Sequence, residues 1–212
     1  MKLTIVYDNE AYKAGLKADW GFACVMEAYG KRILFDTGAN GMILLDNMQQ
    51  LGIDPKTIRE VFISHGHWDH TGGLAEFLKV NDEVKLYVPT SWTPSIGVKD
   101  VIKVDKPLQL HENIFSTGTV KGVEQSLVIK LDKGVAIVVG CSHSGVNNIL
   151  GVASEFGKPS AIIGGLHGFN EFELIKELEL ICPTHCTQFK SRIKSLYPDK
   201  YVEGGVGKII EL

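Results

Sequence analysis

Runs of apolar and β-branched residues recur along the whole chain, separated by short turns that carry glycine. Runs of this kind predict β-strands, and Tyr29-Gly30-Lys31 and Asp132-Lys133-Gly134 predict tight turns between neighbouring runs. We therefore expect strands over Leu3–Tyr7, Phe22–Ala28, Arg32–Phe35, Glu60–Ser64, Lys85–Val88, Val101–Val104, Ile114–Ser116, Ser126–Leu131, Val135–Val139, Ala161–Ile163 and Lys208–Leu212.

Helical spacing of apolar residues appears between the strand-rich stretches. Met42, Leu45 and Met48 predict a helix over Asn40–Leu51, which Gly52 ends. We expect further helices over Gly73–Val80, Val146–Phe156, Glu171–Leu180 and Phe189–Leu196. Strands followed by helices occur twice, which predicts an α/β fold of two sheets packed face to face with helices outside. The pattern is also compatible with an ordinary three-layer α/β domain.

Composition narrows the class of protein. No linker rich in Pro, Gly or Ser divides the chain, so we expect one domain over residues 1–212. A net charge of −3 without a basic run argues against nucleic-acid binding, and no apolar stretch approaches the ~20 residues that span a bilayer. The N-terminus lacks the apolar centre of a signal peptide, so we expect a cytoplasmic protein with reduced cysteines. The oligomeric state stays open.

One cluster of polar residues stands out, His65-Gly66-His67-Trp68-Asp69-His70, directly after the strand Glu60–Ser64. His65 and His67 lie two residues apart, so an extended backbone points both imidazoles to the same side. Asp69 and His70 follow where we expect a loop. Imidazole and carboxylate suit Zn²⁺, Mn²⁺ or Fe²⁺, and such a cluster can place ligands around two ions.

Further candidate ligands stand alone in the second half of the chain. They are His143, His167 and His185, each where an apolar strand or helix ends among small residues that let the backbone approach an ion. A histidine in a turn can simply be a hydrogen-bonding residue. Six such histidines together predict a metal centre, because removing that many titratable groups from water without a metal is costly.

These residues resemble the metallo-β-lactamase superfamily, whose signature is His-x-His-x-Asp-His followed by distant single ligands. The resemblance covers nearly the whole chain, and Phe35-Asp36-Thr37-Gly38 matches the segment whose aspartate supports the metal loop. A narrower resemblance is to proteins similar to dihydropterin ribofuranosyl-aminobenzene phosphate synthase. It rests on the first cluster and on Glu124-Gln125-Ser126-Leu127, Gly140-Cys141-Ser142-His143, Gly164-Gly165-Leu166-His167 and Pro183-Thr184-His185-Cys186-Thr187.

The resemblance implies an αββα sandwich and two divalent ions, zinc first, with manganese or iron as alternatives. It makes His65, His67 and His143 ligands of one ion and Asp69, His70 and His185 ligands of the other. Asp69 would also act in catalysis by orienting the attacking water. The bridging aspartate of the superfamily has no counterpart between His143 and His185. His167 is the first candidate for that position, and Cys141, next to the ligands, is the second.

A hydrolase that activates water to attack an anionic ester or phosphoester small molecule is the function that this resemblance favours. Imidazole in place of the bridging carboxylate would leave the centre one unit more positive, which would suit an anionic substrate. Two alternatives stay open: a pterin-related phosphoribosyl synthase, and a non-catalytic ligand-binding domain that a metal stabilises.

Overall fold

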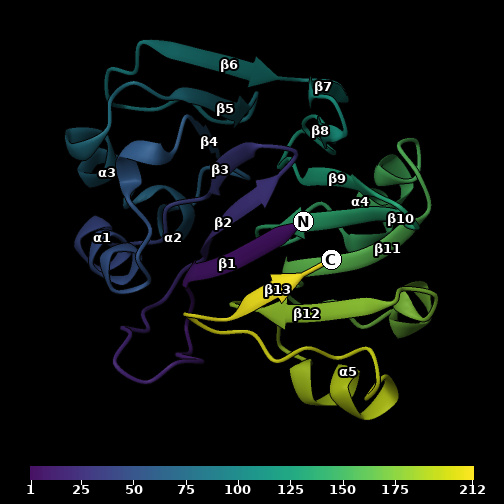
Figure 1. Ribbon diagram of the computed structural model, residues 1–212. Coiled ribbons are helices and arrows are strands. Elements are labelled where there is room, and N and C mark those ends of the chain that lie inside the picture. The colour runs from purple at the N-terminus through teal and green to yellow at the C-terminus, as the bar shows by residue number, and fades with distance from the viewer.

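The computed structural model describes residues 1–212, whose strands form two sheets packed face to face (Figure 1). The first sheet contains, in spatial order, β13 (Ile209–Glu211), β1 (Lys2–Tyr7), β2 (Ala23–Ala28), β3 (Lys31–Phe35), β4 (Glu60–Phe62), β5 (Lys85–Pro89) and β6 (Asp100–Val104). The second contains β12 (Leu180–Thr184), β11 (Pro159–Gly165), β10 (Gly134–Val139), β9 (Leu127–Leu131), β8 (Ile114–Ser116) and β7 (Leu108–His111).

Helices cover the outer face of each sheet, as the two flanks of Figure 1 show. Against the first sheet lie α1 (Gly41–Gln50), α2 (Trp68–Thr71) and α3 (Leu74–Val80), and against the second lie α4 (Val146–Ala153) and α5 (Lys190–Leu196). Short 3₁₀ turns occur at Pro55–Thr57 and Phe172–Ile175. None of the helices has the length and apolar character needed to cross a membrane.

Three apolar clusters correspond to the three contacts between the four layers. The central cluster joins the inner faces of both sheets, through residues such as Phe35 and Phe62 from the first and Val138 from the second. The two outer clusters join each sheet to its helices. Along β10 the side chains alternate as a strand requires, because Val138 lies in the central cluster whereas Ile137 and Val139 face the helices. The predicted αββα sandwich is therefore confirmed.

Both sheets are mixed, and this places several strand ends at one edge of the sandwich. Strands β3 to β6 run parallel, as do β10 to β12, so their carboxyl ends point the same way within each sheet. The sheets come close where β4 and β10 end: a Cβ on Gly140 would lie 2.2 Å from Ser64 Oγ. Only glycine permits this approach, which brings the polar strand ends of the two sheets together.

Other sequence predictions need correction. The predicted helix Glu171–Leu180 is wrong, because the chain forms only the 3₁₀ turn Phe172–Ile175 and then enters β12. Its spacing comes from the buried Ile175 and Leu178, which pack inward without a continuous helix. Strand β12 was not expected. It lies at a sheet edge, where the missing backbone N–H of Pro183 removes no hydrogen bond between strands. The edge strand β7 was also missed, and the loop expected at Asp69 and His70 is helix α2.

The stacked pair Phe35 and Phe62 tests the central cluster. Their ring centroids are 5.5 Å apart, and neither side chain is exposed. Phe62→Ala should lower the free energy of unfolding by about 3–5 kcal/mol, because it leaves a cavity between the sheets. Urea denaturation measures this. The matched control Met42→Ala, at a side chain that is 71% exposed, should change it by less than about 0.5 kcal/mol. Equal losses would contradict the layer assignment.

Candidate metal centre

The candidate ligands come from loops that follow four strands at the shared edge of the sandwich. The sequence His65–His70 follows β4, Cys141 and His143 follow β10, His167 follows β11, and His185 follows β12. Each strand is buried and apolar up to the point where the polar residues begin. The sandwich therefore carries the ligands on rigid strand ends rather than on free loops.

Helix α2 sorts the residues of the first cluster. It begins after His67, which has an extended backbone, and its single turn directs Trp68 outward, where the side chain is 64% exposed. The next two residues, Asp69 and His70, point inward and are buried. The single helical turn therefore separates Trp68, which faces solvent, from Asp69 and His70, which face the interior.

The first group of ligand atoms belongs to His65, His67 and His143, and these atoms lie within 4.8 Å of one another. His65 Nε2 is 3.1 Å from His67 Nδ1, and the ring centroids of His67 and His143 are 4.8 Å apart. His65 is buried, His143 is half-buried and His67 is exposed. This group therefore opens to solvent.

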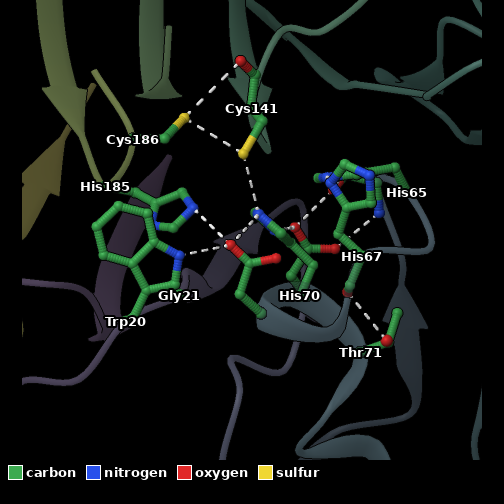
Figure 2. Close-up of polar contacts among 12 residues, drawn as sticks. Trp20, Gly21, His65, His67, His70, Thr71, Cys141, His185 and Cys186 are labelled. Atoms are coloured by element: carbon green, nitrogen blue, oxygen red, sulfur yellow. Dashed lines mark hydrogen bonds and ion pairs between the residues drawn. The ribbon is translucent and has the colours of Figure 1, made fainter. Parts of the chain in front are cut away.

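The second group consists of Asp69, His70 and His185, all of which are buried. Asp69 Oδ2 lies 3.2 Å from His185 Nε2 and 3.9 Å from His70 Nε2. Trp20 Nε1 donates a hydrogen bond of 3.0 Å to the same oxygen, and Figure 2 shows the Trp20 indole beside the imidazole of His185. The structure thus brings together both groups of three that the sequence suggested; that they bind metal stays a prediction.

Asp36 fixes the orientation of two imidazoles. Its carboxylate accepts hydrogen bonds of 2.7 Å from the amide and the hydroxyl of Ser64, and His70 Nδ1 is 2.7 Å from Oδ2. Because the Ser64 hydroxyl donates to Asp36, its oxygen accepts from His65 Nδ1 at 2.9 Å. With both Nδ1 atoms protonated, the Nε2 atoms of His65 and His70 present lone pairs to the centre.

Asn9 does the same for His185. The amide oxygen of Asn9 accepts from the backbone of Gly21 at 3.0 Å, and its nitrogen donates to the carbonyl of His185, which fixes the orientation of the amide. His185 Nδ1, 2.9 Å from that oxygen, must therefore carry the proton. Its Nε2 lies 3.2 Å from Asp69 Oδ2 and has no hydrogen-bond partner.

The imidazoles of His65, His70 and His143 are held in the neutral form, which is the form that binds metals. Burial, and then the neighbouring imidazoles, lower the pKa of His65 and of His70 well below the usual range. Burial and the rings of His67 and His167 lower the pKa of His143 to about 4. None of these rings needs to lose a proton before it can ligate an ion.

These residues fit divalent ions on two observations. His143 Nε2 and His185 Nε2 are buried without any hydrogen-bond partner. Burial also raises the pKa of Asp36 well above its usual range, against the hydrogen bonds from Ser64, so its negative charge lacks an offsetting cation. A cation among the Nε2 atoms would satisfy the orphaned nitrogens and offset the buried carboxylate.

Cys141, rather than His167, lies between the two groups. Its Sγ is 3.1 Å from His70 Nε2. Cys141 belongs to one possible ligand group with His65 and His70 and to another with His185. His167 is exposed, and its ring centroid lies 4.9 Å from that of His143, so it joins none of the groups. The first candidate for the bridging position is thus not favoured by the geometry. The second one is.

Sequence reasoning missed several supporting residues. Asn9, Trp20 and Ser64 hold the ligands, and Cys186 lies 3.3 Å from Cys141, sulfur to sulfur. The signal for Asn9 was available, because the strand Leu3–Tyr7 turns polar at the same sheet edge. Trp20 precedes Gly21 in an irregular segment, and no pattern there would have indicated it.

The backbone at the centre is unusual in a way that supports a function. Seven non-glycine residues have positive φ, and four of them are at the centre: Asp36, Ser142, His167 and His185, with φ of 55°, 60°, 44° and 47°. This left-handed region is unfavourable for residues with a Cβ and persists where surrounding contacts hold it. The loops are therefore held in place for their side chains.

Comparisons with known proteins agree with this geometry. The sequence model of the metallo-beta-lactamase superfamily matches residues 21–150. The 7,8-dihydropterin-6-methyl-4-(beta-D-ribofuranosyl)-aminobenzene-5'-phosphate synthase of Methanocaldococcus jannaschii is 27% identical over 281 aligned residues, which cover 98% of this chain and 95% of that protein. Tm1679, described as a metal-dependent hydrolase of the beta-lactamase superfamily, superposes with a TM-score of 0.81 at 22% identity over 100% of this chain and 99% of that one. YhfI of Bacillus subtilis, a metallo-beta-lactamase fold protein, gives 0.70 at 15% identity over 99% of both chains.

Asp36→Asn tests the orienting role of the carboxylate. An amide keeps the size but cannot accept all three hydrogen bonds, so His70 should lose its fixed tautomer. We expect metal affinity to fall about 10- to 100-fold, measured as metal content after dialysis against graded chelator. Asp54→Asn is the matched control, because Asp54 is exposed and only caps the turn at Pro55–Thr57. Unchanged affinity in Asp36→Asn would contradict this role.

Proposed function

Because the chain belongs to the metallo-β-lactamase superfamily, we propose that it is a metal-dependent hydrolase with two divalent ions side by side. The observation that carries the proposal is the convergence of two groups of three ligand atoms at one edge of the sandwich. The ligands we propose are His65, His67 and His143 for one ion and Asp69, His70 and His185 for the other, with Cys141 between them.

When bound, the ions, zinc first and manganese or iron as alternatives, supply an activated water and positive charge for the developing oxyanion. The chain's own catalytic residue is Asp69. Trp20 holds its Oδ2 by a hydrogen bond of 3.0 Å, so the orientation of the carboxylate is set before substrate arrives. From this position Asp69 would accept a proton of the attacking water and direct its lone pair at the substrate.

The substrate we propose is a small anionic ester or phosphoester. A cavity of about 300 Å³ lies beside His143 and His167, on the solvent side of the centre. Helix α4 begins at its edge with Val146, and the first N–H groups of a helix have no partner within it. These donors and the two imidazoles suit an anionic group. Glu171, which is exposed, is the one carboxylate among the lining residues.

The charge argument made from the sequence changes with the geometry. It assumed a neutral imidazole at the bridging position, whereas we propose Cys141 there, whose sulfur would carry a negative charge when it binds an ion as a thiolate. The preference for an anionic substrate therefore rests on the cavity and on α4, and no longer on a missing charge at the centre.

A pterin-related synthase is the second candidate, favoured by the 27% identity with the synthase of M. jannaschii. The 281 aligned residues exceed the 212 of this chain, so that protein carries insertions relative to it. Trp20 and Trp68, more than half exposed near the ligands, offer surfaces on which a planar ring could stack. Thermal stabilisation by a pterin, without turnover of esters, would favour this candidate.

The proposed function is tested with protein loaded separately with zinc, manganese or iron and assayed on phosphodiesters, lactones and thioesters. We expect turnover of anionic esters that chelator abolishes and metal restores. Cleavage of lactams alone by tightly loaded two-zinc protein would contradict the proposed substrate class. A chelator-induced fall in melting temperature with no turnover of any substrate would favour the non-catalytic alternative.

Asp69→Asn tests the catalytic residue. The amide keeps the size of the side chain but removes the base and the charge, so kcat/KM should fall at least about 100-fold. Trp20→Phe is the companion variant: it removes only the hydrogen bond that orients Asp69, and we expect a loss below about tenfold. Metal content is measured in both variants. Full activity of metal-loaded Asp69→Asn would exclude Asp69 as the proton acceptor.

A further inference from the structure

Two cysteines meet at the centre from different strand ends. Cys141 follows β10 and Cys186 follows β12, and their Sγ atoms are 3.3 Å apart. Figure 2 shows both sulfurs above the ring of His70, beside His185. The other two cysteines, Cys24 and Cys182, lie instead in the apolar cluster between the sheets.

The surrounding backbone leaves room for the sulfurs. A Cβ on Gly165 would lie 2.4 Å from the carbonyl oxygen of Gly140 and 2.8 Å from Cys186 Sγ. Glycine at the end of β11 thus lets Cys186 reach across to Cys141. The thiol of Cys141 is buried and Cys186 is partly exposed, so an ion could reach the pair from solvent.

The sulfurs share their surroundings with other ligand atoms. Cys141 Sγ, Cys186 Sγ and His185 Nε2 lie within 4.8 Å of one another, and Asp69 Oδ2 is 3.2 Å from that nitrogen. Two sulfurs and an imidazole nitrogen are donors of the kind that zinc takes, and the same nitrogen also belongs to the group with Asp69 and His70. Thiolates select Zn²⁺ or Cd²⁺ over Mn²⁺ and Mg²⁺, which prefer oxygen.

We propose that Cys186 is an additional ligand of the ion held by Asp69 and His185, and that Cys141 serves both ions, so that a pair of sulfurs makes the centre selective for thiophilic divalent ions. The inference rests on the proposed metal centre but not on hydrolysis. It names the class of ion that the centre should hold in a mixture of metals.

Cobalt substitution tests this in the full-length chain. Fully loaded wild type should show thiolate-to-cobalt charge-transfer absorption in the near ultraviolet, since three cobalt–sulfur bonds are expected. Cys186→Ser should lose roughly a third of the intensity per cobalt, and Cys141→Ser roughly two thirds. Cys24→Ala, a core variant, should keep all of it. Cys186→Ser should also bind Cd²⁺ at least about tenfold more weakly while its Mn²⁺ affinity stays within about twofold.

Several outcomes would overturn the proposal. These are a cobalt protein without the charge-transfer band, a Cys186→Ser protein with full intensity, and a Cys141–Cys186 disulfide in protein purified under reducing conditions. If a variant does not fold, zinc-edge X-ray absorption of the wild type decides instead, because the proposal requires three zinc–sulfur bonds of about 2.3 Å per pair of zinc ions, one more than a bridging Cys141 alone would give. A charge-transfer band in a protein that hydrolyses nothing would support this inference and count against the hydrolase.

Discussion

The buried carboxylate of Asp36 joins the ends of two neighbouring strands, β3 and β4, to helix α2. It accepts hydrogen bonds from Ser64 at the end of β4 and from His70 on α2, while its own residue ends β3 with a positive φ. Burying such a group is unfavourable unless partners surround it. The carboxylate fixes the orientation of the His70 imidazole directly and that of the His65 imidazole through the hydroxyl of Ser64.

The two groups of ligands differ in their access to solvent. Asp69, His70 and His185 are enclosed, whereas His67 is exposed and His143 is half-buried beside the cavity. An ion in the enclosed group would be held mainly by the protein, and one in the open group would keep room for an incoming molecule. A centre built in this way separates retention of metal from contact with substrate.

The layers and the positions of most candidate ligands were predictable because they depend on local patterns. The continuous apolar run of β10 indicates a strand that is buried on both faces, and His65 and His67 lie on one side because of their spacing. The contacts that the sequence did not predict join distant residues. Asn9 contacts His185 across 176 positions, and the polar turn after β1 does not reveal that partner. The choice between Cys141 and His167 likewise depended on the left-handed backbone of the loops, which spacing does not reveal.

Each group of ligands draws two members from the first half of the chain and one from the second. His65, His67, Asp69 and His70 lie on the first sheet's side, whereas His143 and His185 come from the second. During synthesis, four of the six ligands leave the ribosome long before the other two. Until the second sheet has docked, these four residues can offer an ion only an incomplete coordination site, from which it would exchange readily. Ions bound to the finished centre would then cross-link the two sheets, and their retention would show that both halves of the sandwich have been assembled.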